Sequence, residues 1–331
     1  MASTVIDLDK LFQLFDNTTT IIMNEMNISY LEALAETGEN IFEGDILQDL
    51  DSFTKRRLEK EYGLIDITIV SSEMIRKAYQ LAILKGMKEA IQANHEMTPD
   101  AVCLFISYLI EKLMHSKENF SMLDPAYGTG NLVTAILNNS KKVGKVFGIE
   151  IDETLIRLAY VGANLQKHEI ELFRQDALQP IFVEDVDIVV SDLPVGYYPN
   201  DVVANDYKLR ATNGEHSYSH YLYIEKSLRH LKECGYLIAV IPNFMFEGEQ
   251  ASELNKFIKE SAVIIGLLQL PLSMFKNNNH AKSIFILQKK GEGVRIPKQA
   301  LLAELPSFSK KDAMRGIIKN IDIWFKENLN S

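Results

Sequence analysis

The sequence feature that most constrains the fold is a short apolar run that ends in a two-glycine turn and leads directly into a helical pattern. The run Phe120–Asp124 predicts a buried strand, and the apolar spacing of residues 132–137 predicts a helix. Gly128 and Gly130 lie between them, and glycine allows a positive φ or a close approach of a ligand to the backbone. A strand joined to a helix in this way is typical of open α/β sheets, which bind ligands at the carboxyl ends of their strands.

The rest of the chain repeats this alternation of strands and helices. Further strands are predicted at residues 145–152, 170–177, 186–194, 235–242, 263–270 and 283–288. Helical patterns between them cover residues 153–166, 218–231 and 251–260. Strands separated by helices form a mainly parallel sheet that is covered on both faces, so the predicted fold class is α/β.

Three parts are predicted along the chain. Residues 1–97 contain amphipathic helical stripes and no convincing hairpin, which predicts a helical accessory domain. Thr98-Pro99 is a helix start in front of the α/β domain at residues 98–290, because Thr caps helices and Pro suits the first helical position. Residues 291–331 are predicted to be a helical C-terminal extension.

Charge and composition narrow the possible settings. The 331 residues have a formal net charge of −10, and residues 1–97 alone hold 17 Asp and Glu against 9 Lys and Arg. An acidic surface repels a nucleic-acid backbone, so a nucleic-acid contact would need a local basic patch or a partner. No run is long enough to span a membrane and no signal peptide is recognisable, which predicts a cytoplasmic protein. Cys103 and Cys234 lie in unrelated segments and predict neither a disulfide framework nor a zinc site.

Acidic residues end four consecutive predicted strands. These residues are Asp124, Glu150 with Asp152, Asp176 and Asp192. In a parallel sheet the four strand ends lie side by side, at the edge where such sheets bind ligands. The turn has neither the P-loop nor the three-glycine dinucleotide spacing, so phosphate is not the favoured ligand. A glutamate that accepts ribose hydroxyls, a turn that holds an amino-acid group and an acid at an adenine edge together describe S-adenosylmethionine. The simpler alternative for the turn alone is a strand-to-helix connection without a ligand.

From about residue 98 to residue 290 the chain resembles the class I S-adenosylmethionine-dependent methyltransferases. The closest resemblance is to N6-adenine DNA methylases of the type I restriction modification-subunit kind and their stand-alone bacterial relatives. Residues 124–131 match the motif D-P-A-x-G-T-G-N, residues 148–152 the ribose-binding strand end, and residues 266–275 the late segment I-x-L-P-x-x-x-F. The resemblance implies a Rossmann-like seven-stranded sheet whose last strand is antiparallel. The cofactor-binding residues that it implies are Thr98, Asp124, Pro125, Ala126, Gly128, Thr129, Gly130, Asn131, Glu150, Ile151, Asp176, Ala177 and Asp192.

The resemblance also implies the catalytic segment. Adenine methylases carry [NDS]-P-P-[YFW], in which the first side chain and the next carbonyl accept hydrogen bonds from the target amine and the aromatic stacks on the flipped base. Here Asp192-Leu193-Pro194-Val195 stands at that place, so Val195 replaces the aromatic residue. Tyr197 and Tyr198 follow and are the candidates for the stacking role. The long loop at residues 197–219 is a candidate lid or substrate contact. This chemistry needs no metal.

Three functions remain open from the sequence. The first is methylation of adenine N6 in DNA, possibly with a separate specificity subunit that binds the DNA. The second is methylation of RNA or of a protein glutamine, because the same motif serves amides. The third is a cofactor-binding protein that has lost catalysis and acts through partners, which Leu193 and Val195 favour.

Overall fold

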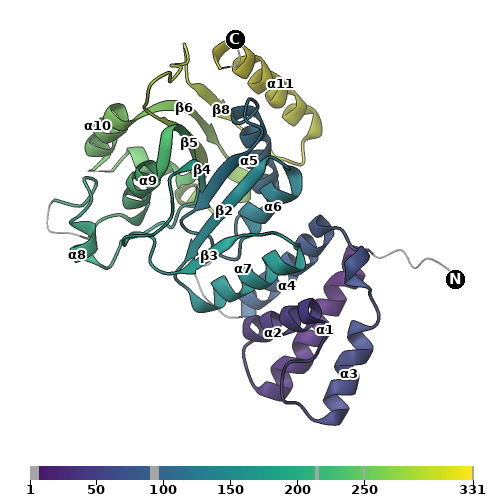
Figure 1. Cartoon of the computed structure of the whole chain (residues 1–331). Coiled ribbons are helices and arrows are strands. Elements are labelled where there is room, and N and C mark those ends of the chain that lie inside the picture. The colour runs from purple at the N-terminus through teal and green to yellow at the C-terminus, as the bar shows by residue number, and fades with distance from the viewer. Residues whose placement is uncertain (1–6, 90–96, 213–215, 249, 330–331) are drawn as a thin grey trace. The chain divides into compact units, whose positions relative to one another are not determined.

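The computed structural model describes residues 7–89, 97–212, 216–248 and 250–329 (Figure 1). The chain forms two compact units. The first unit comprises Met1–Ser107, Tyr127–Lys141 and Gly148–Arg174, and the second comprises Tyr108–Ala126, Lys142–Phe147 and Gln175–Ser331. The chain therefore passes from one unit to the other several times. The predicted division at residues 97/98 and 290/291 stays a prediction.

The first unit is mostly helical. Its elements are α1 (Leu8–Met26), α2 (Tyr30–Glu43), α3 (Ser52–Tyr62), α4 (Ser72–Glu89), the start of α5 (Asp100–Leu113), α6 (Asn131–Asn139), α7 (Glu153–Leu165) and β3 (Glu171–Arg174). Side chains define the helix ends: Ser29 and Glu32 form a capping box at α2, and Asp51 caps α3. The helical character predicted for the N-terminal region is confirmed over its described residues.

One apolar core joins the N-terminal helices α1, α2 and α4 to α7. The α7 side chains in this core are Leu158, Val161 and Leu165. Gly38 of α2 allows the close approach, because a Cβ at this position would lie 2.2 Å from Val161 Cγ1. Arg157 of α7 donates hydrogen bonds to Glu36 at 2.7 Å and to Glu39 at 2.8 Å. The N-terminal helices therefore pack directly on the helix that follows Glu150.

The second unit holds most of the sheet. Its strands are β1 (Phe120–Asp124), part of β2 (Val143–Glu150), β4 (Val186–Asp192), β5 (Leu231–Pro242), β6 (Ala262–Gln269), β7 (Lys282–Lys289) and β8 (Leu301–Glu304). Its helices are α8 (Asp201–Ala204), α9 (Ser219–Arg229), α10 (Ala251–Ser261) and α11 (Lys311–Asn328), with short 3₁₀ turns at Asn243–Phe246, Leu272–Met274 and Asn278–His280. Residues 213–215 of the predicted loop 197–219 lie outside the described residues.

The strand order is β3-β2-β1-β4-β5-β7-β6-β8 (Figure 1). β4 runs parallel to β1 and β5, whereas β7 runs antiparallel to both β5 and β6. The α/β fold and the antiparallel β7 are confirmed, but the predicted count of seven strands is wrong by one. The eighth strand, β8, has four residues without a β-branched side chain and gains its hydrogen bonds from β6, so its own sequence gives little strand signal.

Two further observations apply to the described residues. Within these ranges no helix is both long and apolar enough to cross a membrane. The same ranges contain no cluster of three His, Cys, Asp or Glu side chains with the geometry of a metal site.

Candidate functional site

Asp124 ends β1 as a buried carboxylate that the second unit holds in place. Its side chain is 2% exposed. Oδ1 accepts hydrogen bonds from the Ala126 amide at 3.0 Å and from the Ser191 hydroxyl at 2.7 Å. Pro125 between them is also buried and fixes the backbone at the turn. Because Ser191 precedes Asp192, these bonds tie the end of β1 to the end of β4.

The two glycines of the turn are explained by different structural requirements. Both have a positive φ, 55° at Gly128 and 79° at Gly130. A Cβ on Gly130 would lie 2.4 Å from the Tyr127 ring, so packing excludes a side chain there. A Cβ on Gly128 would have no atom within 4 Å, so this backbone faces open space. Thr129 between them is half-buried. The turn thus presents bare backbone at Gly128, as a ligand-binding turn does.

Glu150 at the end of β2 is oriented by backbone amides of the first unit. Oε2 accepts from the Gly128 amide at 2.8 Å, and Oε1 accepts from the amides of Ile151 at 2.8 Å and Asp152 at 2.9 Å. Ile151 is exposed. A carboxylate offers about four acceptor positions, so Glu150 keeps capacity for a further donor. The structure therefore brings Gly128 and Glu150 together, as the sequence predicts.

Asp176 lies two residues beyond the end of β3, because the observed strand stops at Arg174 rather than extending to residue 177. Asp176 Oδ1 accepts from the Leu178 amide at 2.9 Å, which turns the chain away from the sheet. Asp176 Oδ2 accepts from the Tyr198 hydroxyl. Ala177 next to it is buried. Asp176 is thus held in the same manner as Asp124, by a nearby amide and a hydroxyl.

Asp192 ends β4, and its carboxylate is paired with a lysine that the sequence analysis did not select. Lys282 Nζ at the start of β7 lies 2.8 Å from Asp192 Oδ1, and both side chains are less than one-fifth exposed. Leu193 is buried and its amide donates to the Val240 carbonyl at 3.1 Å. Pro194 is exposed. The segment is therefore anchored at Leu193 and opens to the surface at Pro194.

The two candidate aromatics occupy different environments. Tyr197 is 56% exposed, and its ring stacks on Tyr218 with 4.8 Å between ring centroids and 21° between the planes. Tyr198 is buried, and both burial and the hydrogen bond to Asp176 raise the pKa of its hydroxyl. Val195 is half-exposed. Tyr197 therefore presents an aromatic surface, whereas Tyr198 is part of the packing around Asp176.

Asn131 lies between Thr98 and a buried arginine in the first unit. Asn131 Nδ2 donates to the Thr98 carbonyl at 2.8 Å, and Asn131 Oδ1 accepts from Arg76 Nη1 at 2.6 Å. Arg76 is 2% exposed and also bonds Glu73 and Asp100 at 2.7–3.1 Å. This network connects α4, the start of α5 and the first residue of α6. The side chain of Asn131 is thus engaged in structure, so a ligand would meet its backbone.

Comparisons with known proteins show the family of the chain. The N-6 DNA methylase family matches residues 72–323, about three quarters of the chain. The chain belongs to the N-6 DNA methylase family. It is accordingly an S-adenosylmethionine-dependent methyltransferase, and S-adenosylmethionine is its cofactor. Residues 9–87 of this methylase also match the YtxK N-terminal helical domain.

Two relatives match the methylase over nearly the whole length of both chains. The uncharacterized protein YtxK of Bacillus subtilis (strain 168) is 49% identical over 324 residues, 96% of this chain and 97% of the relative. A crystal structure from Listeria monocytogenes, described as a candidate class I S-adenosylmethionine-dependent methyltransferase, has a TM-score of 0.89 and 43% identity over 96% of this chain and 98% of that chain. The methyltransferase subunit of a type I restriction–modification system from Streptococcus thermophilus has a TM-score of 0.67 and 18% identity, over 96% and 74% of the two chains, and supports the fold.

Three residues that bond to candidate site residues carry no clear signal in the sequence. They are Arg76, Ser191 and Lys282, which hold Asn131, Asp124 and Asp192 respectively. Ser191 precedes Asp192 in a strand, and its inward direction follows from alternation along the strand. Arg76 and Lys282 carry no comparable signal, because charged residues in helices and at strand ends are usually solvated.

Replacing Glu150 with glutamine is expected to raise the dissociation constant of the methylase for S-adenosylmethionine about 10- to 100-fold. A hydrogen bond to a charged group contributes about 1.5–3 kcal/mol. The glutamine side chain keeps only one of the two acceptor oxygens of the carboxylate and carries no charge. Isothermal titration calorimetry measures the change. The control is Glu153→Gln, an exposed glutamate in the first turn of α7 that pairs with Arg174. Equal affinities for the two variants would contradict the assignment of Glu150.

His220 is expected to make the methylase less stable as the pH falls from about 6.5 to about 4. It is buried at the start of α9 against Tyr218 and Tyr221, and burial lowers its pKa to about 4. The unfolded chain takes up this proton near pH 6.5, so between the two values it binds more protons than the folded protein and stability falls by up to about 3 kcal/mol. His230 adds to the effect, because its pKa is also lowered to about 4, mainly by burial.

Thermal unfolding between pH 7.5 and 4.5 tests the contribution of His220. In His220→Leu the loss of stability over this range is expected to be smaller than in the parent protein. His115→Leu removes an exposed histidine and is the matched control. If His220→Leu and His115→Leu lose stability in parallel over this pH range, His220 is not the source.

Proposed function

We propose that this methyltransferase transfers a methyl group from S-adenosylmethionine to the exocyclic N6 amine of adenine in DNA. The observation that carries the proposal is the carboxylate of Asp192 at the end of β4, followed by the anchored Leu193 and the exposed Pro194. This carboxylate and the Leu193 carbonyl would accept hydrogen bonds from the target amine. Both bonds keep the nitrogen lone pair aimed at the methyl group and stabilise the positive charge that develops on the nitrogen.

The residues on both sides of the glycine turn fit a bound S-adenosylmethionine. S-Adenosylmethionine, when bound, supplies an electrophilic methyl group on a sulfonium. We propose that Glu150 accepts its ribose hydroxyls, that the turn from Asp124 to Asn131 holds its amino-acid portion, and that Asp176 meets its adenine. The open space at Gly128 and the three amides that orient Glu150 support this fit. The remaining residues of the proposed cofactor site are Thr98, Ile151, Ala177 and Asp192.

For the target base, Tyr197 is the better candidate of the two tyrosines. Its exposed ring already stacks on Tyr218, so it is held in one orientation. A stacked aromatic contributes about 1–3 kcal/mol per base. Tyr198 is buried and donates to Asp176, so we propose that it positions Asp176 rather than stacking on the base.

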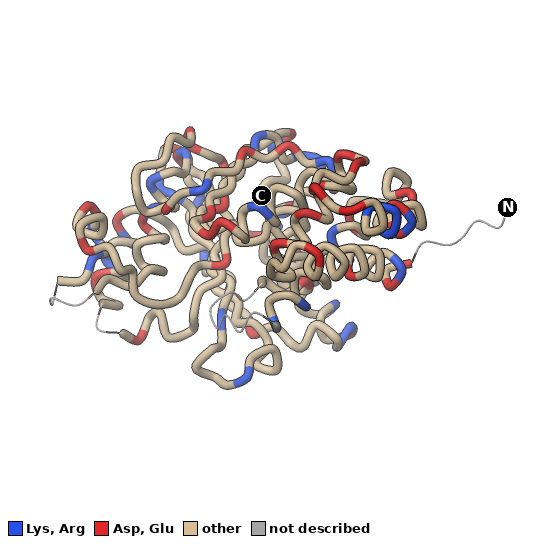
Figure 2. Tube along the Cα trace, turned by 90° about the horizontal axis from the view of Figure 1, so that it is seen from below, with Lys and Arg blue, Asp and Glu red and all other residues tan. Residues whose placement is uncertain are grey.

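Access to DNA is proposed to depend on a separate specificity partner. The net charge of −10 opposes direct binding to a phosphate backbone. In the view of Figure 2, Lys and Arg are scattered among Asp and Glu along the described chain rather than gathered in one stripe. The structurally similar protein from Streptococcus thermophilus is itself named as one subunit of a restriction–modification system.

Methyl transfer from radiolabelled S-adenosylmethionine to three separate pools tests the substrate. The pools are unmethylated DNA, RNA, and protein from a lysate of the source cells. The DNA assay is run both with and without added lysate, because the lysate can supply the partner. Label at N6 of adenine in DNA is the expected result. Label in RNA or in protein glutamine alone would replace DNA with that substrate, because the same hydrogen-bond acceptors suit an amide.

The ion pair between Asp192 and Lys282 favours a second candidate function, a cofactor-binding protein without transfer activity. Lys282 occupies one oxygen of the carboxylate that the target amine would use. Its positive charge also lies close to the nitrogen that becomes positive during transfer, which opposes that step. In this alternative the protein binds S-adenosylmethionine and acts through partners.

Replacing Lys282 with methionine separates the two functions. If the protein has lost catalysis through this pair, Lys282→Met is expected to gain methyl transfer that the parent lacks, whereas Lys282→Arg stays inactive. If the parent is active, the Arg variant should retain most of its activity because it keeps the ion pair. The same labelled-methyl assay measures both variants, and calorimetry with S-adenosylmethionine checks that each still binds the cofactor.

A further inference from the structure

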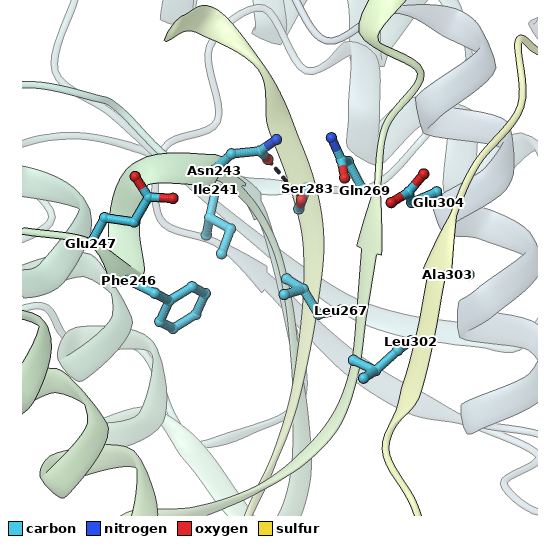
Figure 3. A pocket seen from close by; sticks show the side chains of 10 residues that line it. All are labelled: Ile241, Asn243, Phe246, Glu247, Leu267, Gln269, Ser283, Leu302, Ala303 and Glu304. Carbon is cyan, nitrogen blue, oxygen red and sulfur yellow. Dashed lines mark hydrogen bonds between the residues drawn. The ribbon is translucent and has the colours of Figure 1, made fainter. Parts of the chain in front are cut away.

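A cavity of about 610 Å³ lies on the sheet of the second unit, where β5, β6 and β8 end and β7 begins (Figure 3). Small-molecule sites typically have volumes of about 300–1,000 Å³. The lining side chains come from these four strands, from the 3₁₀ turn Asn243–Phe246 that follows β5, and from Glu247, the next residue. None of the residues assigned above to the cofactor or to methyl transfer lines it.

The cavity is on the opposite face of the sheet from the ion pair of Asp192. Val240 is the register partner of Asp192, and successive residues of a strand point to opposite faces, so Ile241 faces the other way. The same holds for Lys282 and Ser283: Lys282 pairs with Asp192, whereas Ser283 lines the cavity. A ligand in the cavity is therefore separated from the proposed methyl-transfer site by the sheet itself.

One wall of the cavity is a row of polar side chains from three neighbouring strands and from the turn after β5 (Figure 3). Ser283 and Gln269 are register partners on β7 and β6, and Gln269 and Glu304 are register partners on β6 and β8. Asn243 extends the row, because its Oδ1 accepts from the Ser283 hydroxyl at 2.7 Å (Figure 3). That bond leaves the amide nitrogen of Asn243 for other contacts. Three polar groups on adjacent strands, together with Asn243 of the 3₁₀ turn, thus line one side of a single hollow.

Two carboxylates stand on different sides of this hollow. Figure 3 shows Glu247 on the side of the 3₁₀ turn and Glu304 on the side of β8. Among the described residues, neither carboxylate has an ion-pair partner. The polar row lies between them, and an apolar surface that includes Phe246, Leu267 and Leu302 lies beside it (Figure 3). The hollow therefore has a carboxylate on each of two sides, a polar row along one wall and an apolar surface beside that row.

We propose that this cavity binds an aliphatic diamine or polyamine. Such a molecule carries two ammonium groups joined by methylenes, so its charges match Glu247 and Glu304 and its chain matches Leu267 and Leu302. The ring of Phe246 offers a cation a further favourable contact. The polar row supplies acceptors for the remaining ammonium protons. The site uses groups that the methyl-transfer proposal leaves unexplained, and it stands whether or not adenine is the substrate.

Calorimetry of the full-length protein with α,ω-diaminoalkanes of increasing length and with spermidine, in 150 mM NaCl, tests the proposal. We expect one diamine length to bind best. Glu247 and Glu304 belong to separate elements, so the fold sets the distance that the two ammonium groups must span. The monoamine of the same length should bind at least about tenfold more weakly. Glu247→Gln and Glu304→Gln should each weaken binding about two- to fivefold, the range expected for exposed ion pairs, and the double variant should lose more than either.

The controls separate a built site from general charge attraction. Glu260→Gln removes an exposed carboxylate of α10 that does not line the cavity, and it should leave binding unchanged. Leu302→Ser removes an exposed part of the apolar surface and should weaken long diamines more than short ones. The proposal is overturned by no binding at millimolar diamine, by equal binding of monoamine or Mg²⁺, or by an equal loss in Glu260→Gln. Binding of S-adenosylmethionine, measured alongside, reports separately on the methyltransferase site.

Discussion

Methyl transfer is expected to fall about 10²–10³-fold when Asp192 is replaced with alanine, while the affinity for S-adenosylmethionine changes far less. The magnitude is that of removing one group that stabilises charge developing in a transition state. Alanine leaves the anchored backbone of Leu193, and with it one of the two proposed acceptors, so a residual rate should remain. Single-turnover transfer of labelled methyl to the substrate pool identified above measures the effect.

A conservative variant distinguishes catalysis from structure at this position. Asp192→Asn keeps an acceptor oxygen of the same reach, and asparagine is an allowed first residue in the resembling motif, so it should restore much of the rate lost in Asp192→Ala. Both variants lose the charge of the ion pair with Lys282, although asparagine can still accept a hydrogen bond from Lys282 Nζ, so the folding stability of each variant is measured alongside. If Asn and Ala are equally inactive while both bind the cofactor, Asp192 does not act as the acceptor.

Arg76→Met is expected to lower the free energy of unfolding by about 3–5 kcal/mol, the cost of breaking a buried charged network by removing one partner. Arg76 is buried, and the change would leave Glu73, Asp100 and Asn131 without their shared donor. Hydrogen bonds from Arg76 lower the pKa of both carboxyls, whereas burial alone would raise it. Chemical denaturation measures the loss. Because Asn131 begins α6 directly after the glycine turn, cofactor binding should weaken as well.

Lys77 provides the matched control for Arg76. It is the next residue on α4, is 43% exposed and lies 3.5 Å from the same Glu73. Lys77→Met therefore removes one positive charge from the same helix without opening a buried network. A change of at most about 1 kcal/mol is expected, as for other exposed pairs. Similar losses in the two variants would mean that charge, rather than the buried hydrogen bonds, accounts for the effect.

The alternation of apolar runs and helical patterns was sufficient to predict the α/β fold. A parallel strand that is buried on both faces needs apolar residues along most of its length, so it is recognisable in the sequence. The same pattern located Gly128 and Glu150 together, since carboxyl ends of parallel strands share an edge. The turn residues were predictable for a local reason: Gly128 and Gly130 need a positive φ.

The parts that could not be predicted depend on long-range pairing. β8 exists because β6 offers it an edge, and its four residues carry no strand pattern of their own. The different environments of Tyr197 and Tyr198 depend on the partners Tyr218 and Asp176, about twenty residues away in either direction along the chain. Lys282 is ninety residues from Asp192, so no local window contains the pair. These are tertiary contacts between residues distant in the sequence, so the spacing of residue types does not predict them.

The contact between Gly38 and Val161 limits how this protein can change over time. A side chain added at Gly38 would collide with Val161, so a substitution at Gly38 is expected to require a smaller residue at position 161. Removing the N-terminal helices would instead expose Leu158, Val161 and Leu165 of α7 to water as an apolar patch that favours aggregation. The helical region and the helix after Glu150 are therefore expected to be inherited together, with neither exchanged alone between lineages.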